Sequence, residues 1–443
     1  MRTPPTAPPA RPTSGTRGAL GVVVVGALLL AAAPAASAAD RNLRTTTAPV
    51  STTTVRVAPA LAAYTPTPAD TRMAKALTSR ATTTRFGTSF SGAVVDAASN
   101  ATVWSKSGTT VKMPASTNKL VTASNALTLF GPDKRWTTQV RQGAYSTRVV
   151  LVGSGDPSLK SSSLDAMART TATMLLGKKI TQARVYVDDD IFPTPSLAYG
   201  WKSSYVPDSI APVRALVRDQ RNNSDTSAEA GRYFRDRLKA YGVSAAGYYG
   251  RANAASGSAV IASSNGSTLS TIIKTMLLNS DNEIAETLHK QVGRALGHGA
   301  TWTGARTAQA EELAVQKLTS GPLYDGSGLS RADRLSAVQL ARIVDRGVDP
   351  ATQAKLWPLK SGLPTAGRTG TLASRFSTTA SKCAVGKVWA KTGTLSDVVA
   401  LAGWTTGTDG RVKAFAFLVN GKTSSTTLKQ NVDMLAATVN GCY

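Results

Sequence analysis

The chain has 443 residues, of which 42% are apolar and 17% charged. That is enough apolar material for one large core or for two to three domains, and it excludes a wholly disordered chain. Lysine and arginine total 51 against 26 acidic residues, and the formal charge of +25 favours polyanionic surroundings. With only two histidines and two cysteines, most structural zinc sites, haem and iron–sulfur ligation are excluded, and a histidine-based triad would depend on His289 or His298.

The first 38 residues have the features of a secretory signal. They combine three arginines and no acid with the apolar run 19–33 and the small-residue site Ala36-Ser37-Ala38, so we expect cleavage after Ala38. A retained membrane anchor is the alternative, which Pro34 and the cleavage site disfavour. We therefore expect a secreted, cell-wall-associated protein whose positive charge suits anionic cell-wall polymers and not nucleic acid.

Both cysteines, Cys383 and Cys442, lie near the C-terminus. In an exported protein an even pair favours a disulfide, here one that pins the C-terminal tail against the core. Two unrelated buried thiols are the alternative, and neither cysteine is a candidate nucleophile.

The segment 39–70 is rich in threonine, proline and alanine, which predicts a flexible spacer with ordered structure from about Met73. The pattern next predicts a strand hairpin at 90–95 and 101–104 and a helix from Pro114 to Gly131-Pro132. The later predicted elements are strands 149–152 and 185–187, helices 227–241, 267–278, 283–296 and 335–348, strands 388–390, 398–404 and 414–419, and a helix 428–439. Predicted strands and helices occur in separate blocks near the two ends of the chain. This arrangement predicts an α+β fold with an antiparallel sheet flanked by helices.

Ser116 and Lys119 are three residues apart at the start of the helix that begins at Pro114. Residues i and i+3 share a helix face, and this face continues into Leu120, so the hydroxyl and the amine are within reach of each other and aimed inward. A buried lysine can act as a base, because desolvation and a nearby positive charge both lower its pKa. Lowering that pKa from about 10.4 to about 7 requires roughly 4 to 5 kcal/mol, which calls for a dry site and a second cation.

Lys391 is the candidate second cation, and it follows the apolar strand residues 388–390. Alternate residues of a strand share a face, so either Lys391 or Thr392 points into the cleft. We favour the orientation in which Lys391 faces Ser116 and Lys119.

Further polar groups surround these residues in the sequence. Gly393 has no side chain and would let a peptide lie close along the strand edge, while Thr392 and Thr394 offer hydroxyls to a carboxylate. Ser280 and Asn282 lie in a break between two predicted helices, where a short loop can place both on the cleft side.

The three segments occur in a definite order, with S-x-x-K at a helix start, S-D-N between helices and K-T-G on a strand. This triple resembles that of penicillin-binding proteins and class A β-lactamases. From about Met73 to its end, the chain resembles the low-molecular-mass penicillin-binding proteins of the D-alanyl-D-alanine carboxypeptidase/endopeptidase type, the PBP4-like group of peptidase family S13. The secondary segments that add to the resemblance are 155–159, 187–189, 325–330 and 370–372.

The resemblance implies a role for each motif residue. Ser116 would be the acylated nucleophile, Lys119 its base, Ser280 a proton shuttle and Asn282 a ligand to the substrate amide. Lys391, Thr392 and Thr394 would hold the terminal carboxylate, with the backbone N–H groups of Ser116 and Thr394 forming the oxyanion hole. No metal and no organic cofactor is implied.

The resemblance also implies the penicillin-binding/serine β-lactamase-like transpeptidase fold, with an inserted smaller α/β domain between the first two motifs. We expect residues 71–134 and 263–443 to form the catalytic domain and residues 135–262 the inserted domain.

The expected function is an exported serine-type D-Ala-D-Ala carboxypeptidase that acts on peptidoglycan stem peptides and is acylated, and so inhibited, by β-lactam antibiotics. A DD-endopeptidase that cleaves peptide cross-links is the nearest alternative. A β-lactamase is disfavoured because no deacylating carboxylate can be assigned. A non-catalytic cell-wall-binding protein is the alternative from a different class.

Other polar residues have structural explanations. His289 suits an exposed or capped helix position better than a catalytic base. Asp156 and Asp325 lie in glycine-rich segments, where aspartate commonly forms turns.

Overall fold

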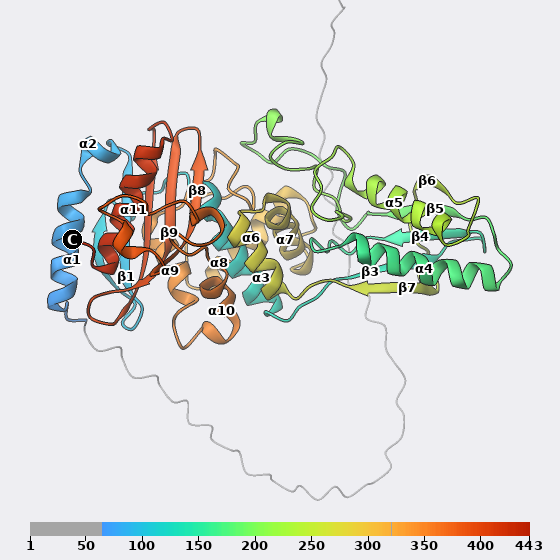
Figure 1. Cartoon of the computed structure of the whole chain (residues 1–443), viewed down its shortest axis with the longest axis horizontal. Coiled ribbons are helices and arrows are strands. Elements are labelled where there is room, and N and C mark those ends of the chain that lie inside the picture. The colour runs from blue at the N-terminus through green and yellow to red at the C-terminus, as the bar shows by residue number, and fades with distance from the viewer. Residues whose placement is uncertain (1–63, 320) are drawn as a thin grey trace, which may run out of the picture. The chain divides into compact units, whose positions relative to one another are not determined.

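The computed structural model describes residues 64–319 and 321–443 (Figure 1). The expected signal segment 1–38 lies outside the described residues, as does the expected spacer up to residue 63.

Helix α1 (Pro68–Arg80) begins inside the segment expected to be a spacer, so the prediction that ordered structure starts near Met73 is wrong. A capping box starts this helix: the Thr67 hydroxyl accepts a hydrogen bond from the Asp70 N–H, and the Asp70 carboxylate accepts one from the Thr67 N–H. Pro68 occupies the first helical position, where its missing N–H is not needed.

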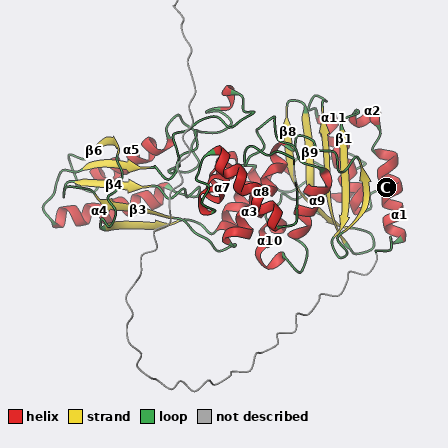
Figure 2. Ribbon diagram, turned by 180° about the vertical axis from the view of Figure 1, so that it is seen from behind, coloured by secondary structure: helices red, strands yellow, loops and turns green. Residues whose placement is uncertain are grey.

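The first sheet has five strands in the order β2-β1-β10-β9-β8, and every neighbouring pair is antiparallel (Figure 2). Its strands are β1 (Phe90–Asp96), β2 (Ala101–Lys106), β8 (Val388–Leu395), β9 (Val398–Thr406) and β10 (Val412–Asn420). Strand β1 is buried along its whole length, because helices pack on both of its faces. The predicted antiparallel sheet flanked by helices is therefore confirmed.

Two apolar cores lie on opposite faces of this sheet. On one face α1 and α11 (Thr426–Asn440) pack against Phe415 and Phe417. The other core joins the sheet to a group of helices that carries the first two motifs. Those helices are α3 (Lys119–Phe130), α6 (Leu269–Asn279), α7 (Asn282–Ala295), α8 (Trp302–Val315), α9 (Ala337–Arg346) and α10 (Gln353–Ser361).

A second sheet lies between the first and second motifs in the sequence, with strand order β6-β5-β4-β3-β7. Its strands are β3 (Thr137–Gln142), β4 (Arg148–Val152), β5 (Arg184–Asp188), β6 (Gly247–Arg251) and β7 (Val260–Asn265). Strands β4, β5 and β6 are parallel, whereas β3 pairs antiparallel with β4 and β7. Helices α4 (Ser161–Gly177) and α5 (Thr226–Ala240) pack on one face of this sheet.

Short helices complete the described fold. These are α2 (Thr83–Phe86) and the 3₁₀ turns η1 (Ala115–Asn118), η2 (Ser203–Tyr205), η3 (Gly370–Leu372) and η4 (Lys382–Ala384). A disulfide joins Cys383 of η4 to Cys442, with Cα atoms 6.2 Å apart, and so ties the chain end beyond α11 to the segment before β8.

The N-terminal helix is tied to the first sheet by a buried ion cluster. Nζ of Lys413 on β10 lies 2.6 Å from the Asp70 carboxylate and 2.8 Å from that of Asp96. A buried ammonium requires such partners, because removing it from water unpaired is costly.

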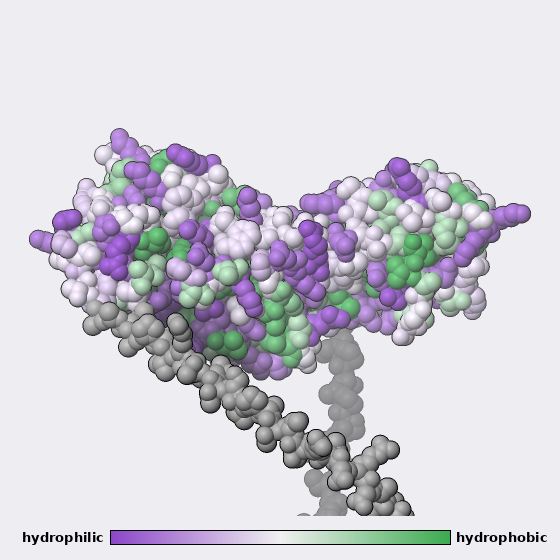
Figure 3. All heavy atoms as spheres, turned by 90° about the horizontal axis from the view of Figure 1, so that it is seen from below, coloured by the Kyte–Doolittle hydropathy of each residue, from purple (hydrophilic) through white to green (hydrophobic). Residues whose placement is uncertain are grey.

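No helix among the described residues is both long and apolar enough to cross a bilayer. On the face seen in Figure 3, apolar side chains form separate small patches among polar ones.

Candidate active site

Ser116 lies on a 3₁₀ turn and not in the first turn of an α-helix, because η1 precedes α3 and the α-helix begins only at Lys119. This corrects the prediction of a helix from Pro114. Side chains at i and i+3 eclipse each other in a 3₁₀ turn, so Ser116 and Lys119 still stack on one side. Ala115 has φ of +47°, an uncommon conformation for a residue with a side chain, directly before Ser116.

The amine of Lys119 is buried and has three polar neighbours. Its Nζ lies 3.1 Å from Oγ of Ser116, 2.7 Å from Oδ1 of Asn282 and 2.8 Å from the backbone carbonyl of Ser327. The last two are carbonyl oxygens, which can only accept hydrogen bonds. A neutral amine has two N–H groups and one lone pair. If its two N–H groups satisfy the two carbonyls, its lone pair is left for the proton of the Ser116 hydroxyl.

Burial lowers the pKa of Lys119 to about 8, although Asp325 and Glu286 act in the opposite direction. Lys391 is also fully buried, and burial followed by the nearby charge of Lys119 holds the pKa of Lys391 well below its ordinary value. Two ammonium groups in one dry site disfavour each other, so the pair favours states in which at least one amine is neutral.

The second motif is positioned by the junction of two helices. Ser280 ends α6 with φ of +60°, and Asp281 caps α7 by accepting a hydrogen bond from the N–H of Ile284. Asn282 is therefore the first residue of α7. Its Nδ2 donates to the carbonyl of Ser209 at 2.8 Å, which fixes the side-chain amide with Oδ1 toward Lys119.

The third motif lies on β8. Nζ of Lys391 donates to Oγ of Ser280 at 2.9 Å and to the carbonyl of Thr392 at 2.7 Å. Lys391 thus contacts the second motif directly, and after burial it is the charge of Lys119 in the first motif that lowers the pKa of Lys391. The five predicted catalytic residues form two hydrogen-bonded sets, one of Ser116, Lys119 and Asn282 and the other of Ser280 and Lys391.

Gly393 has a different use from the one expected. A Cβ atom at this position would lie 2.7 Å from the carbonyl oxygen of Pro114 and 3.2 Å from the backbone N of Thr117. The missing side chain therefore lets the turn that carries Ser116 approach β8, and Gly393 is absent from the residues that line the cavity.

A loop from Asp325 to Ser330 supports Lys119 from behind. The Asp325 carboxylate accepts hydrogen bonds from the N–H groups of Gly328 and Ser330, each at 2.7 Å, so its expected turn-forming role is confirmed. Trp201 also donates to this carboxylate at 2.7 Å. This loop places the carbonyl of Ser327 on the amine of Lys119.

Glu286 also holds this loop and was missed from the sequence. Its carboxylate accepts the N–H groups of Gly326 and Ser327 at 2.9 and 2.7 Å, and burial together with Asp325 raises the pKa of Glu286 to about 8. Glu286 lies four residues after Asn282 on α7, and this spacing, which puts both on one helix face, was the available signal.

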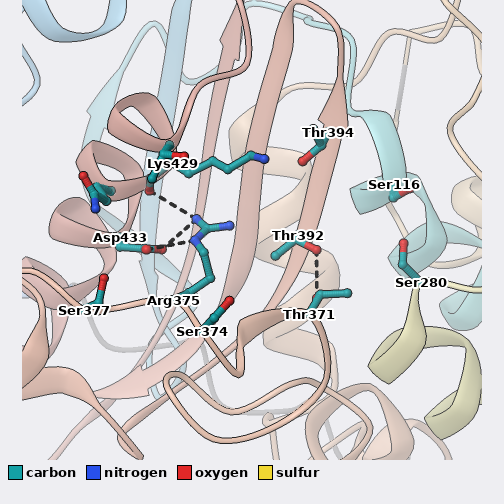
Figure 4. Close-up of a pocket in the computed structure, with 12 residues that line it drawn as sticks. Ser116, Ser280, Thr371, Ser374, Arg375, Ser377, Thr392, Thr394, Lys429 and Asp433 are labelled. Carbon is teal, nitrogen blue, oxygen red and sulfur yellow. Dashed lines mark hydrogen bonds and ion pairs between the residues drawn. The ribbon is translucent and has the colours of Figure 1, made fainter.

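A cavity of about 500 Å³ opens in front of Ser116 (Figure 4). Ser280, Thr392 and Thr394 line it, as the sequence predicted for a substrate cleft. The side chains that the sequence analysis missed come from the segment after η3 and from α11: Thr371, Ser374, Arg375, Ser377, Thr426, Lys429, Gln430 and Asp433. Lys119, Asn282 and Lys391 are not among the lining residues, and Lys119 and Lys391 are fully buried.

His289 is not exposed, contrary to the prediction. It is 2% exposed on α7, and burial lowers its pKa to about 4. A histidine of such low pKa is neutral at physiological pH, and it does not line the cavity. Among residues 64–319 and 321–443, no group of histidine, cysteine and acidic side chains has the arrangement of a metal site.

The sequence matches a known peptidase family. The model of the D-Ala-D-Ala carboxypeptidase 3 (S13) family matches residues 73–221 and 206–439. Carboxypeptidase DacB of Mycolicibacterium smegmatis is 32% identical over 397 residues, which cover 85% of each chain. The D-alanyl-D-alanine carboxypeptidase of Actinomadura sp. (strain R39) is 26% identical over 426 residues, covering 74% of this chain and 77% of the relative.

Solved structures show the same fold. Penicillin-binding protein 4 (dacB) of Haemophilus influenzae superposes with a TM-score of 0.69 at 19% identity, covering 82% of this chain and 97% of that one. A predatory peptidoglycan endopeptidase of Bdellovibrio bacteriovorus gives a TM-score of 0.51 at 16% identity, covering 80% and 93%. The predicted α+β penicillin-binding fold and the PBP4-like resemblance are thereby confirmed. This chain belongs to the D-Ala-D-Ala carboxypeptidase 3 (S13) family and is a hydrolase.

Proposed function

We propose that this protein is an exported serine-type D-Ala-D-Ala carboxypeptidase that acts on peptidoglycan stem peptides through an acyl-enzyme on Ser116. One observation carries the proposal: two of the three polar neighbours of the Lys119 amine can only accept hydrogen bonds, which directs its lone pair to Ser116. The names of the relatives, carboxypeptidase DacB and D-alanyl-D-alanine carboxypeptidase, support the substrate class.

In the acylation step, Oγ of Ser116 attacks the carbonyl carbon of the penultimate D-alanine while its proton moves to Nζ of Lys119. The backbone N–H groups of Ser116 and Thr394 are the proposed donors to the oxyanion. The C–N bond then breaks and the last D-alanine leaves. The leaving nitrogen takes a proton for which the Ser280 hydroxyl, hydrogen-bonded to Lys391, is the proposed donor. Ser280 in turn regains the proton that Lys119 took from Ser116, so that Lys119 is again a neutral amine before deacylation.

In the deacylation step, water attacks the ester carbonyl and loses a proton to the neutral amine of Lys119. The ester C–O bond breaks, and Oγ of Ser116 regains a proton from the ammonium of Lys119. The reaction then yields a peptide shortened by one D-alanine and the free enzyme. Asn282, with its side chain fixed by Ser209, is proposed to hold Lys119 in place and to meet the substrate amide.

β-Lactams are proposed to acylate the same serine, because their ring resembles the D-Ala-D-Ala end and their ester would deacylate slowly. A structure of the Haemophilus influenzae relative is complexed with a β-lactam, which supports this expectation. Export to the cell wall is proposed from the features of residues 1–38, and the net charge of +25 suits anionic wall polymers there.

Covalent labelling with a fluorescent penicillin tests the proposed function. We expect stable labelling of the purified protein and none of the Ser116→Ala variant. A wild-type protein that never acquires label would contradict the proposal and support a non-catalytic wall-binding protein. Rapid loss of the label would instead indicate a β-lactamase.

Cross-link cleavage is a second candidate, favoured by the extent of the cavity. The space beyond Thr394 continues to Thr426 and Gln430 of α11, and a volume of about 500 Å³ is in the range that holds ligands much larger than alanine. Released D-alanine measured against cleaved dimer, with defined muropeptides, separates the two activities. More D-alanine than cleaved dimer supports the carboxypeptidase, and the reverse supports the endopeptidase.

A further inference from the structure

We propose that Lys429 is a specificity-determining residue that binds the terminal carboxylate of the substrate and so selects peptides with a free C-terminus. This inference rests on the proposed function and adds a residue that the three sequence motifs do not contain. Lys429 lies in the first turn of α11, far along the chain from all three motifs, and lines the same cavity as Ser116 and Thr394.

The position of the Lys429 side chain suits this role. Lys429 is half-buried, and Figure 4 shows its amine extended from α11 across the cavity toward Thr394. Thr392 and Thr394 present hydroxyl groups to the same space. Hydroxyls can donate hydrogen bonds to a carboxylate, but they supply no opposite charge.

The other cationic side chains near the cavity, Lys391 and Arg375, already have hydrogen-bond or ion-pair partners within the protein. The Lys391 amine is fully buried and donates to Oγ of Ser280 and to the carbonyl of Thr392, and burial disfavours its charged form. The resemblance assigned the carboxylate to Lys391, but this amine does not line the cavity. Lys391 is therefore poorly placed to supply a full positive charge to a bound anion.

Arg375 is balanced by a carboxylate. Its Nε and Nη2 lie 2.9 and 2.7 Å from the two oxygens of Asp433, whose side chain is 1% exposed. Such a two-point pair cancels the charge of both groups and fixes the guanidinium. Arg375 also donates to the backbone carbonyl of Lys429 at 3.2 Å, which holds the base of that side chain.

Lys429 is the cationic residue of the cavity whose charge is not balanced by a carboxylate. Within residues 64–319 and 321–443, its amine has no hydrogen-bond or ion-pair partner, and Asp433, already paired, is the one acidic residue lining the cavity. The first turn of α11 holds no acidic residue, and the positive end of the helix dipole disfavours a cation there. A bound anion would balance the charge of Lys429 and would interact favourably with the positive end of the helix dipole.

The chemistry of the cavity thus specifies its ligand as a carboxylate held between the Lys429 ammonium and the hydroxyls of Thr392 and Thr394. A stem peptide ending in D-Ala-D-Ala presents that group, whereas the same peptide with a C-terminal carboxamide does not. Lys429 should therefore contribute to binding of the first peptide and not to binding of the second.

The test compares these two peptides in the wild type and in Lys429→Gln, Lys429→Arg and Lys355→Gln variants. Lys355 is exposed on α10 and does not line the cavity, so its variant reproduces the loss of net charge alone. The bond from Arg375 goes to the backbone of residue 429 and is available in every variant. Binding is measured by calorimetry in the Ser116→Ala background, and hydrolysis is measured with Ser116 intact.

We expect Lys429→Gln to weaken binding of the carboxylate peptide roughly 10- to 100-fold, the usual value of a hydrogen bond to a charged group. Binding of the carboxamide should stay within about 2-fold, and Lys429→Arg should restore most of the carboxylate affinity. Equal losses for both peptides, or no loss for either, would overturn the inference. Carboxylate-selective binding that depends on Lys429, without hydrolysis by the wild type, would overturn the proposed function and leave the inference standing.

Discussion

Oδ1 of Asn282 lies 2.7 Å from Nζ of Lys119, and the opposite end of the same amide is anchored to the carbonyl of Ser209. The contact is neutral, so it positions the lysine without adding a negative charge that would raise its pKa. Burial lowers the pKa of Lys119 to about 8, against the opposing effect of Asp325 and Glu286.

Replacing Asn282 with aspartate should therefore impair the base. A carboxylate at this distance favours the ammonium and should raise the pKa of Lys119 by about 1 to 3 units. Acylation by a fluorescent penicillin at pH 7 should then slow by about 10-fold or more, with its pH profile moved to higher pH. Asn279→Asp, at an exposed position at the end of α6, makes the same charge change and should leave the profile in place. An unshifted profile in Asn282→Asp would contradict this account of the contact.

The close approach of β8 to the Ser116 turn predicts that Gly393→Ala disturbs activity and stability together. The new Cβ would lie 2.7 Å from the carbonyl oxygen of Pro114, and relief of such overpacking costs about 1–3 kcal/mol. A displacement of the turn approaching 1 Å could reduce acylation about 100-fold.

Urea unfolding and penicillin labelling measure the two effects of Gly393→Ala. Gly177→Ala is the matched control, because nothing lies within 4 Å of a Cβ at this position in α4. The control should acylate like the wild type and should be no less stable, because alanine is favoured over glycine in a helix. Wild-type behaviour of Gly393→Ala would show that the two segments do not need their close contact.

A further prediction concerns the contribution of the disulfide to stability. It closes a loop of 59 residues, for which the chain-entropy model gives a stabilisation of about 4 kcal/mol. We expect the double variant Cys383→Ser, Cys442→Ser to lose a large part of this free energy of unfolding in urea. It should still be labelled by penicillin at 25 °C, because the bridge joins the chain end to η4 and neither cysteine lines the cavity. Unchanged stability would contradict the proposed contribution of the bridge.

Much of the fold around the motifs could be predicted from the sequence. Strands β1, β9 and β10 are apolar runs that are buried along most of their length, and their predicted bounds agree with the structure within a few residues. Helix α3 ends at Gly131, as the glycine and the following proline indicate. Strands β3 and β6 were missed because their residues are largely polar or glycine, and only pairing with neighbours makes them strands.

The site could be predicted in its residues but not in its geometry. Spacing of three residues indicated that Ser116 and Lys119 meet, although the turn between them is 3₁₀. Alternation along β8 left two orientations for Lys391, and only tertiary packing selects the buried one. Lys429 and Arg375 reach the cavity from α11 and from the segment after η3, outside the three motifs, and no local pattern marks such residues.

The most direct test of the central claim is the pH dependence of acylation by a fluorescent penicillin. The base must be neutral, so the rate constant should rise with pH through about 8, the pKa to which burial lowers Lys119. In Lys119→Arg, whose guanidinium stays charged, acylation should fall at least 100-fold at every pH. The measurement should span pH 6 to pH 10, about two units on either side of that pKa. A wild-type rate constant that does not change over this range would contradict the account. An arginine variant that is acylated as fast as the wild type would contradict it too.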